Sequence, residues 1–440
     1  MTLYLISVAG CLFLYGTILS LIARSQISPS TLWATVWGIS FALTAIFGGV
    51  FVVDAEAALV MLVIFAMPLG EVLTVALSGK FVLTTQQKSI RLLKIRILQK
   101  RSGTIQWICI AISFSGALYL AKTFGTPLFK VGSFGDLAEI GRMNARGIFR
   151  GELEIPFFAK IAFMFLQFGV ILSGFSCASQ SGRKKYTWTV LLFFTAILWT
   201  LITTQRSYFV ACAVWWVGAY LTAKVYVGEE RRVLKPRVIL AVLAAAIVLP
   251  IMIVSVRSIR TGNSLSSNLG QAFESSRAWF AGYIPGFSAW YTHWNHQLDF
   301  GGSLFGGIVS ILSLGQVGDS GASEAGFYAI GAGATTNALT LLRFVIGSFG
   351  VIGGALLLIL FAFLARYTYD RCRAGSLTAA AMLPAIFVTI IWSPNSWFFG
   401  YGSRLIAVLL CLIGFHTAQY CMRFSRHSTR ASNMLVSGRG

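Results

Sequence analysis

The amino-acid sequence predicts an all-α polytopic membrane protein with about eleven transmembrane helices. Its 440 residues are 56% apolar and only 11% charged, with a mean hydropathy of +0.76. A soluble protein of this length could not bury so much apolar surface. The second observation is a series of apolar runs, each near the roughly 20 residues that cross a bilayer. These runs lie at about 3–22, 31–53, 57–77, 104–122, 156–178, 187–203, 207–223, 238–256, 341–365, 377–392 and 405–421.

The basic residues set the expected orientation of these spans. Alternate short loops and the C-terminal tail hold 23 of the 35 Lys and Arg residues but only three acids, Glu229, Glu230 and Asp370. By the positive-inside rule these segments are cytoplasmic, so we expect a periplasmic N-terminus and a cytoplasmic C-terminus. Topology and anionic membrane lipids therefore explain the net charge of +21, and we expect no nucleic-acid partner.

The chain is expected to form one transmembrane domain over residues 1–440. Two long segments fall on the outer side, a first loop at 123–155 and a large loop at 257–340 that we expect to carry short helices. The Ser/Arg-rich tail at 425–440 is expected to be cytoplasmic and disordered. No soluble domain of ordinary size fits between the spans, so a functional site would be built from outer loops and the outer ends of helices.

Several arginines lie on the outer side, where a cation needs a partner. Arg206 sits in a tight hairpin between two spans, Arg257 and Arg260 share one helical face, Arg343 lies inside the opening of an apolar helix, and Arg404 begins the last span. Arginine inside a membrane usually faces a polar cavity or an anion, and its bidentate contacts suit phosphate. These residues predict a site for a lipid-borne pyrophosphate. The alternatives are contact with lipid phosphates and, for Arg404, interfacial anchoring.

The large outer loop contains a dense aromatic stretch. Tyr283, Trp290, Tyr291 and Trp294 lie within it. Such amphipathic rings either rest on the membrane interface or stack on sugar rings. We carry both interpretations, and the sugar interpretation assigns these residues to a saccharide.

The same loop holds the candidates for a general base. His293 and His296 are two of them, because imidazole is the side chain most often used for proton transfer, although surface histidines without a role remain an alternative. Asp319 and Glu324 are further candidates in a polar stretch. The H-x-x-H-x-x-D spacing that ends at Asp299 could place three ligands on one helix face, but no fourth ligand is apparent, so we predict no metal.

Glycine is frequent in the ninth apolar run. Gly347, Gly350, Gly353 and Gly354 fall close together there. We interpret all four as sites of close helix packing.

Four segments together resemble a known family. Residues 336–343 (TNALTLLR) and 348–353 (SFGVIG) resemble the "TN-x-x-T-x-x-R … D-F-G-x-x-G" signature of Wzy-type O-antigen polymerases. Residues 282–287 (GYIPGF) and 203–206 (TTQR) are similar to that family's "Y-x-x-G/P-x-F" segment and "T-x-x-R" hairpin. The likeness covers about the last 250 residues. Ser348 departs from the family pattern, because Asp often stands at that position.

The resemblance implies a GT-C-like fold in a bacterial inner membrane. It implies an enzyme that joins oligosaccharide repeat units on the periplasmic face, with polyprenyl pyrophosphate as leaving group, no metal and no cofactor. Its partners would be the lipid-linked oligosaccharide, membrane lipids and a chain-length regulator protein. The pyrophosphate would be bound by Arg206, Arg257, Arg260, Arg343 and Arg404. The acceptor hydroxyl would be deprotonated by His293, His296 or Glu324. The sugar would contact Asn337 and the four aromatic residues Tyr283, Trp290, Tyr291 and Trp294.

Two other functions fit much of the same sequence. An O-antigen ligase, which transfers glycan to lipid A core or protein, shares the fold and the donor chemistry. A glycolipid flippase belongs to another class and predicts inverted repeats with polar residues near mid-membrane. Here the middle parts of the spans are almost free of charge, with Glu71 and Lys160 as exceptions. Surface chemistry is therefore favoured over translocation.

Overall fold

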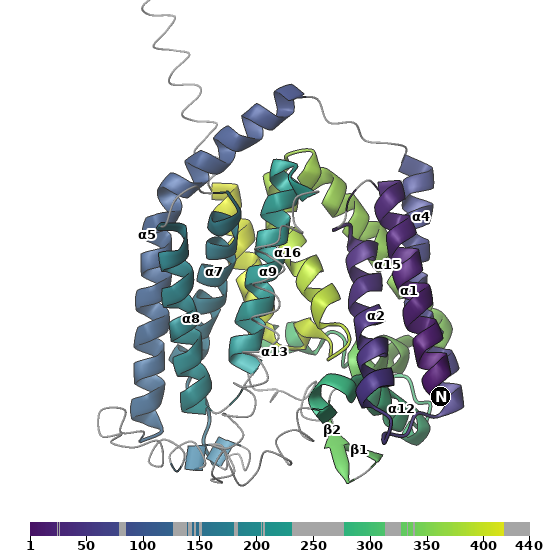
Figure 1. Cartoon of the computed structure of the whole chain (residues 1–440). Helices are drawn as coiled ribbons and strands as arrows, with labels where there is room; N and C mark the ends of the chain where they lie inside the picture. The colour runs from purple at the N-terminus through teal and green to yellow at the C-terminus, as the bar shows by residue number, and fades with distance from the viewer. Residues whose placement is uncertain are drawn as a thin grey trace, which may run out of the picture.

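We describe the protein from a computed structural model. Its described part is almost entirely helical, with one short β-hairpin at one end of a helix bundle (Figure 1). The described residues are 1–23, 25, 27–78, 85–125, 139, 143–144, 147–148, 152–179, 184–203, 205, 207–230, 277–312, 327–331, 333–337 and 339–417.

In this part of the chain, eight helical segments are long and apolar enough to cross a membrane, and two shorter apolar helices, α16 (Leu377–Trp392) and Gly402–Thr417, accompany them. This agrees with the predicted all-α polytopic membrane protein. The apolar run at 238–256 lies outside the described residues, so the count of eleven spans stays a prediction. The long segments are α1 (Thr2–Ala23), α2 (Pro29–Phe47), α3 (Ala55–Val60) continued by η1 (Met61–Phe65) and α4 (Ala66–Ser78), α5 (Thr85–Thr123), α7 (Phe157–Ser179), α8 (Lys184–Thr203), α9 (Ser207–Val227) and α15 (Thr340–Arg373).

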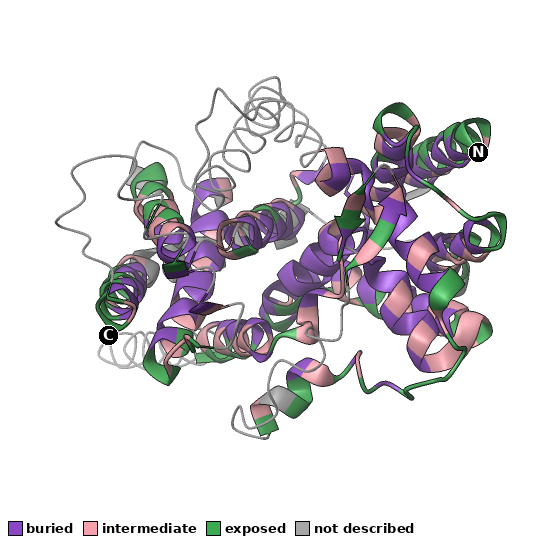
Figure 2. Ribbon diagram, turned by 90° about the horizontal axis from the view of Figure 1, so that it is seen from below, coloured by how far each residue is buried: buried purple, intermediate pink, exposed green. Residues whose placement is uncertain are grey.

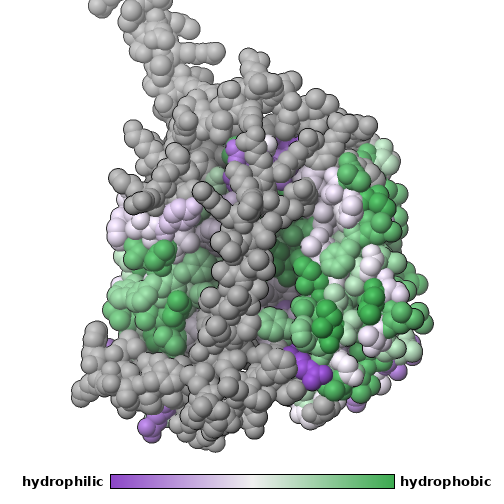
Figure 3. Space-filling model, viewed as in Figure 1, coloured by the Kyte–Doolittle hydropathy of each residue, from purple (hydrophilic) through white to green (hydrophobic). Residues whose placement is uncertain are grey.

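The surface of the bundle is what a lipid-facing protein requires. Apolar side chains gather at mid-height on the visible face (Figure 3), and Leu14, Val190 and Leu360 are among the large apolar residues that stand exposed. A soluble monomer rarely exposes apolar surface so extensively.

The second span is shorter than predicted. Ser28 caps the N-terminus of α2 by accepting a hydrogen bond from the Thr31 amide, and the helix ends at Phe47, not at residue 53. The backbone leaves the helical conformation at Gly48, with φ −87° and ψ 8°, while its N–H still bonds to the Thr44 carbonyl. Hydropathy alone missed this end because Phe51, Val52 and Val53 continue the apolar run. Residues 48–54 instead form a linker between α2 and α3, which we call the α2–α3 linker.

The ninth span is longer than predicted and is broken. It runs to Arg373, eight residues beyond the expected end at 365. Inside it Gly350 has φ 70° and ψ 179°, a conformation essentially restricted to glycine. The interpretation of Gly350 as a packing glycine was therefore wrong. We call Thr340–Phe349 the α15 arm and residues 351–373 the α15 span.

The arm folds back against the start of the span. A Cβ on Gly354 would lie 3.6 Å from backbone atoms of Val345 and Ile346. In a continuous helix, residues eight apart are separated by about 12 Å along the axis. Gly354 thus does serve close packing, as predicted, but within a helical reversal.

Two hydrophobic cores hold the bundle together. One gathers α1, α2, α4, α12 and α15, and the other gathers α5, α7, α8, α9 and Gly402–Thr417 (Figure 2). Helix α16 contributes side chains to both cores and packs on α9. Glycines permit the closest approaches between helices, as at Gly116 against Ala162 and Gly218 against the Pro384 carbonyl.

One end of the bundle carries the short elements. They are α12 (Tyr283–His293), α13 (Gly306–Leu312), the antiparallel strands β1 (Tyr328–Gly331) and β2 (Ala334–Thr336), and η3 (Phe398–Gly400) (Figure 1). The N-terminus lies at the same end, which we call the α12 end. The distribution of basic residues predicts that this end faces the periplasm, and it therefore holds the predicted outer site.

Candidate functional site

Helix α12 is fastened to the N-terminal half of the chain by the α2–α3 linker and by the first turn of α3. The Asp54 amide donates to the Ser288 hydroxyl at 2.7 Å, and the Tyr291 hydroxyl donates to Glu56 Oε1 at 3.2 Å. Burial, with the negative charges of Glu56 and Asp54, raises the pKa of Tyr291, so its phenol stays protonated and remains a donor. These contacts join segments more than 230 residues apart.

A second face of α12 packs on the α15 arm. Ring atoms of Trp290 lie 3.5 Å from where a Cβ on Gly347 would stand, and the Gly347 carbonyl accepts the Asp299 amide at 3.1 Å. At the start of the arm the Leu341 amide donates to the Ser393 carbonyl at 2.7 Å. The arm is therefore held between α12, the loop after it and the loop after α16.

Arg343 lies on this arm. Its neighbours Leu341, Leu342 and Phe344 are buried, whereas Arg343 is half-buried with its guanidinium 5.8 Å from the Phe344 ring centre. The sequence predicted Arg343 in the outer turns of a continuous span. The structure instead places it on a separate segment that folds back on the α15 span and packs against α12.

Arg404 has a different environment. Its side chain is only 6% exposed, and Nη1 donates to the Phe398 carbonyl at 2.7 Å. The guanidinium lies 4.2 Å from the Phe398 ring centre, 4.4 Å from that of Tyr401 and 5.5 Å from that of Trp392. A side chain so enclosed leaves little surface for a lipid headgroup, so these contacts give Arg404 a packing role within the protein. They also place Arg404 beside the loop that holds the Leu341 end of the α15 arm.

The other predicted ionic residues cannot be placed. Four of them lie outside the described residues, namely Arg206, Arg257, Arg260 and Glu324. The five-arginine cluster therefore stays a prediction. Asn337 is described and stands exposed directly after β2.

The four predicted sugar-binding aromatics divide into two pairs. Trp290 and Tyr291 are 5% and 8% exposed and belong to the core with Phe287. Tyr283 and Trp294 are half-buried and keep open ring surface, and the Trp294 ring stacks on Trp290 with centres 5.1 Å apart. The buried pair therefore supports Trp294, whereas the ring of Tyr283 contacts Trp279, with centres 6.3 Å apart.

The two histidines do not share a helix face. Helix α12 ends at His293, Trp294 adopts an extended conformation, and His296 has a φ of 59°. The spacing that could have placed His293, His296 and Asp299 on one helix face does not do so, because the helix stops before the second histidine. Among the residues that the structure describes, no three potential metal ligands gather.

His293 has the geometry of a base. Its Nδ1 lies 2.7 Å from the Ala289 carbonyl oxygen, which can only accept, so Nδ1 carries the proton. In the neutral ring, Nε2 then holds the free lone pair, and the ring is exposed beside Tyr328 of β1. His296 instead packs its ring against Trp294, with centres 4.8 Å apart.

Asp299 organises the loop that follows. Its carboxylate accepts hydrogen bonds from the Gly301 amide at 3.0 Å and from the Ser303 amide at 3.1 Å, as well as from the Ser303 hydroxyl. Partial burial acts to raise the pKa of Asp299, but these hydrogen bonds outweigh it and the pKa is lowered. Asp299 is therefore a weak base with a positioning role.

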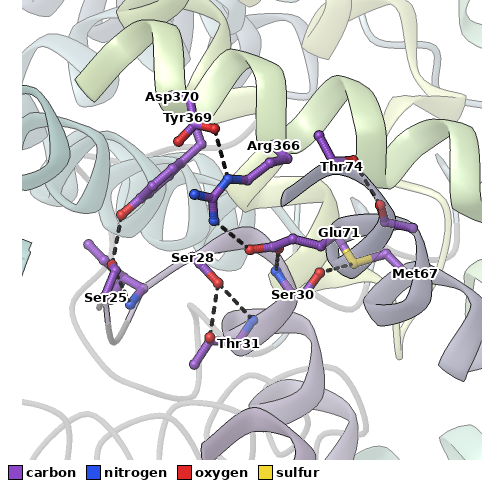
Figure 4. A network of polar contacts seen from close by, with 12 residues as sticks. Ser25, Ser28, Ser30, Thr31, Met67, Glu71, Thr74, Arg366, Tyr369 and Asp370 are labelled. Carbon is purple, nitrogen blue, oxygen red and sulfur yellow. Dashed lines mark hydrogen bonds and ion pairs between the residues drawn. The ribbon is translucent and has the colours of Figure 1, made fainter. Parts of the chain in front are cut away.

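A buried charge network that the sequence did not predict lies at the opposite end of the bundle (Figure 4). Glu71, 1% exposed, accepts from Arg366 Nη1 at 2.9 Å and from the Ser30 amide at 2.7 Å. Arg366 also pairs with Asp370 at 2.9 Å, and Tyr369 donates to Ser25 at 2.7 Å. The network ties the α15 span to α4 and to the N-terminus of α2. The predicted span stopped at 365, one residue before Arg366, so the partner of Glu71 was missed.

The chain matches no protein-family description, no curated protein and no solved structure. The likeness to Wzy-type polymerases therefore rests on the sequence motifs alone.

Proposed function

We propose that this protein is a membrane glycosyltransferase of the Wzy polymerase type, which joins oligosaccharide units carried on polyprenyl pyrophosphate at the α12 end. One observation carries the proposal: Arg343 sits on an arm that folds back on its own span and packs against an aromatic helix. A cation at that position suits an anionic headgroup whose lipid tail stays in the bilayer. The aromatic helix beside it suits the attached saccharide.

The chemistry needs few protein groups. A hydroxyl of the acceptor sugar attacks the anomeric carbon of the donor, a new glycosidic C–O bond forms, and the bond from that carbon to the pyrophosphate oxygen breaks. Arg343 stabilises the negative charge that develops on the departing polyprenyl pyrophosphate. His293 Nε2 takes the proton of the attacking hydroxyl. Alignment of donor and acceptor contributes the rest of the rate acceleration.

The sugar would lie on the open rings of Tyr283 and Trp294. Trp290 and Tyr291 pack on the Trp294 ring and are themselves buried in the core. A platform held this rigidly orders few side chains when the sugar binds, which limits the entropic cost of binding.

The buried Glu71–Arg366 pair is the observation that would best suit a transporter instead. Charged residues inside spans often mark ion or substrate paths. Here, however, Arg366 neutralises Glu71 directly, and the Ser30 amide holds the second carboxylate oxygen. These contacts favour a static structural pair over a translocation path.

The test uses purified protein in detergent, with a polyprenyl-pyrophosphate oligosaccharide as the sole substrate, with and without a chelator. A ladder of products one repeat apart, unaffected by the chelator, is the expected result. If no ladder forms but glycan is transferred to an added lipid A core acceptor, the protein is a ligase. If neither occurs but the same lipid crosses the bilayer of liposomes, the protein is a flippase and the proposal is wrong.

A further inference from the structure

The α2–α3 linker forms one wall of the α12 end, although it lies far from the large outer loop in sequence. Besides the Asp54–Ser288 and Tyr291–Glu56 bonds, the Val52 amide donates to the Ile330 carbonyl of β1 at 2.9 Å. The linker is thus bonded to both α12 and the hairpin. Any saccharide on α12 would lie beside it.

The two acids of this wall have different tasks. Asp54 caps α3: its Oδ1 accepts from the Glu56 amide at 2.8 Å and from the Ala57 amide at 3.2 Å. The described hydrogen bond of the Glu56 carboxylate is with the Tyr291 hydroxyl, and Glu56 itself is exposed. Glu56 therefore presents a carboxylate that the fold does not use for capping.

Tyr291 fixes where that carboxylate stands. Its ring is 8% exposed and stacks on Phe287, with centres 6.0 Å apart. The Tyr291 ring also contacts the rings of Trp294 and His296, with centres 6.0 Å and 5.9 Å away. One immobile ring therefore carries both a hydrogen-bonded carboxylate at its tip and the more open aromatic residues around it.

This combination matches the surface of a sugar. A pyranose has apolar C–H faces, which stack on aromatic rings, and a rim of hydroxyls, which donate hydrogen bonds. A carboxylate accepts two such bonds, and charge-assisted hydrogen bonds are about twice as strong as neutral ones. We propose that Glu56, held by Tyr291, accepts hydroxyl hydrogen bonds from the saccharide that stacks on Trp294, and so helps select it. This role rests on the proposed function for its biological meaning, but it can be measured as binding alone.

The experiment is equilibrium dialysis of the purified full chain against radiolabelled repeat-unit oligosaccharide. The oligosaccharide is released by mild acid from the polyprenyl-pyrophosphate-linked form that is used in the ladder assay. The key variant is Glu56→Gln, which keeps the shape and an acceptor for the Tyr291 hydroxyl but loses the charge. Glu154→Gln is the matched control, because Glu154 is an exposed acid before α7 in the other half of the bundle. Tyr291→Phe tests the support of the carboxylate.

We expect Glu56→Gln to weaken saccharide binding about tenfold, the loss of one or two charge-assisted hydrogen bonds. Tyr291→Phe should weaken it a few-fold, the double variant should add little to Glu56→Gln, and Glu154→Gln should bind like the parent. The melting temperature of Glu56→Gln should not change. If Glu56→Gln binds as tightly as the parent, or if the parent binds no saccharide, the subsite does not exist.

The ladder assay separates this inference from the proposed function. If the parent makes a ladder while Glu56→Gln binds and reacts normally, the Glu56 subsite is wrong and the polymerase proposal stands. Should the parent bind saccharide in a Glu56-dependent way yet transfer no glycan to either acceptor, the subsite stands and the polymerase proposal fails.

Discussion

Replacing Arg366 by methionine should be the most damaging single change in the α15 span. The guanidinium neutralises Glu71, which is 1% exposed, and Asp370, one turn further along the same helix. Methionine has similar length and no charge, so the substitution tests the charge more than the packing. Without Arg366, Glu71 keeps the Ser30 amide as its hydrogen-bond donor and loses its only described counter-ion.

The expected loss follows from that geometry. Removing one partner of a buried ion pair leaves an uncompensated charge and costs about 3–5 kcal/mol. The upper part of that range applies to Glu71, since its carboxylate is almost inaccessible to water. Asp370 adds less, because its side chain is 22% exposed and can be hydrated. We expect Arg366→Met to lower the free energy of unfolding by about 4–5 kcal/mol.

A double-mutant cycle provides the assay. Arg366→Met, Glu71→Gln and the combined variant are unfolded by titration with SDS in mixed micelles, and helicity is followed by circular dichroism. Glu71→Gln with Arg366→Met leaves no buried charge at this point of contact, so the double variant should recover at least about 1 kcal/mol relative to the sum of the single losses. Additive losses, or an Arg366→Met loss under about 0.5 kcal/mol, would refute the reasoning.

The remaining predictions concern the α12 end. Gly350→Ala should lower the free energy of unfolding by about 1–3 kcal/mol and reduce activity, because alanine cannot hold the conformation of the break. Gly10→Ala, inside helix α1 with open space around it, should not lower stability in the same SDS titration. Arg343→Ala should abolish the product ladder while membrane insertion is unchanged. Arg343→Lys should retain part of the ladder, since lysine keeps the charge without the bidentate geometry. A normal ladder from Arg343→Ala would show that the residue does not belong to the site. His293→Ala should slow transfer about 100-fold or more without weakening saccharide binding, as for a lost general base. The lowered pKa of Asp299 means that its ionised form stabilises the fold above the pKa of the unfolded chain, and that this contribution is lost as the pH falls through the folded value. Asp299→Asn should therefore destabilise the protein at pH 7 and differ less from the parent near pH 3, as measured by thermal melting; an equal difference at both pH values would contradict this.

Hydropathy predicted the positions of the described spans because lipid contact demands long apolar runs with internally satisfied backbones. It failed where another force ended or extended a helix. Helix α2 ended before Gly48 inside an apolar run, and the α15 span continued past residue 365 because Arg366 and Asp370 are paired there. Local composition shows neither a cap nor a distant counter-ion.

The candidate site was predictable only in its local parts. The aromatic stretch around Trp290 is visible in the sequence, and so is an arginine in an apolar segment at 343. The break at Gly350 gave no signal, because three other glycines nearby suggested only packing. Glu56 was overlooked since its partner Tyr291 lies 235 positions away, and a single sequence holds no information on such pairs.

Helix α15 links the two polar regions of the protein and explains why both are needed. The span is fixed at one end by Arg366, which bonds to α4 and reaches the N-terminus of α2 through Glu71. At the other end the chain reverses at Gly350, and the arm that carries Arg343 is held by α12 and by the loop after α16. A site for phosphoryl or glycosyl chemistry requires its charged groups within about 0.5 Å of their working positions. A short buried arm meets that requirement only if the span below it does not shift. In the proposed enzyme the buried network would therefore support the candidate site at the α12 end from the far side of the bundle, without contacting a substrate.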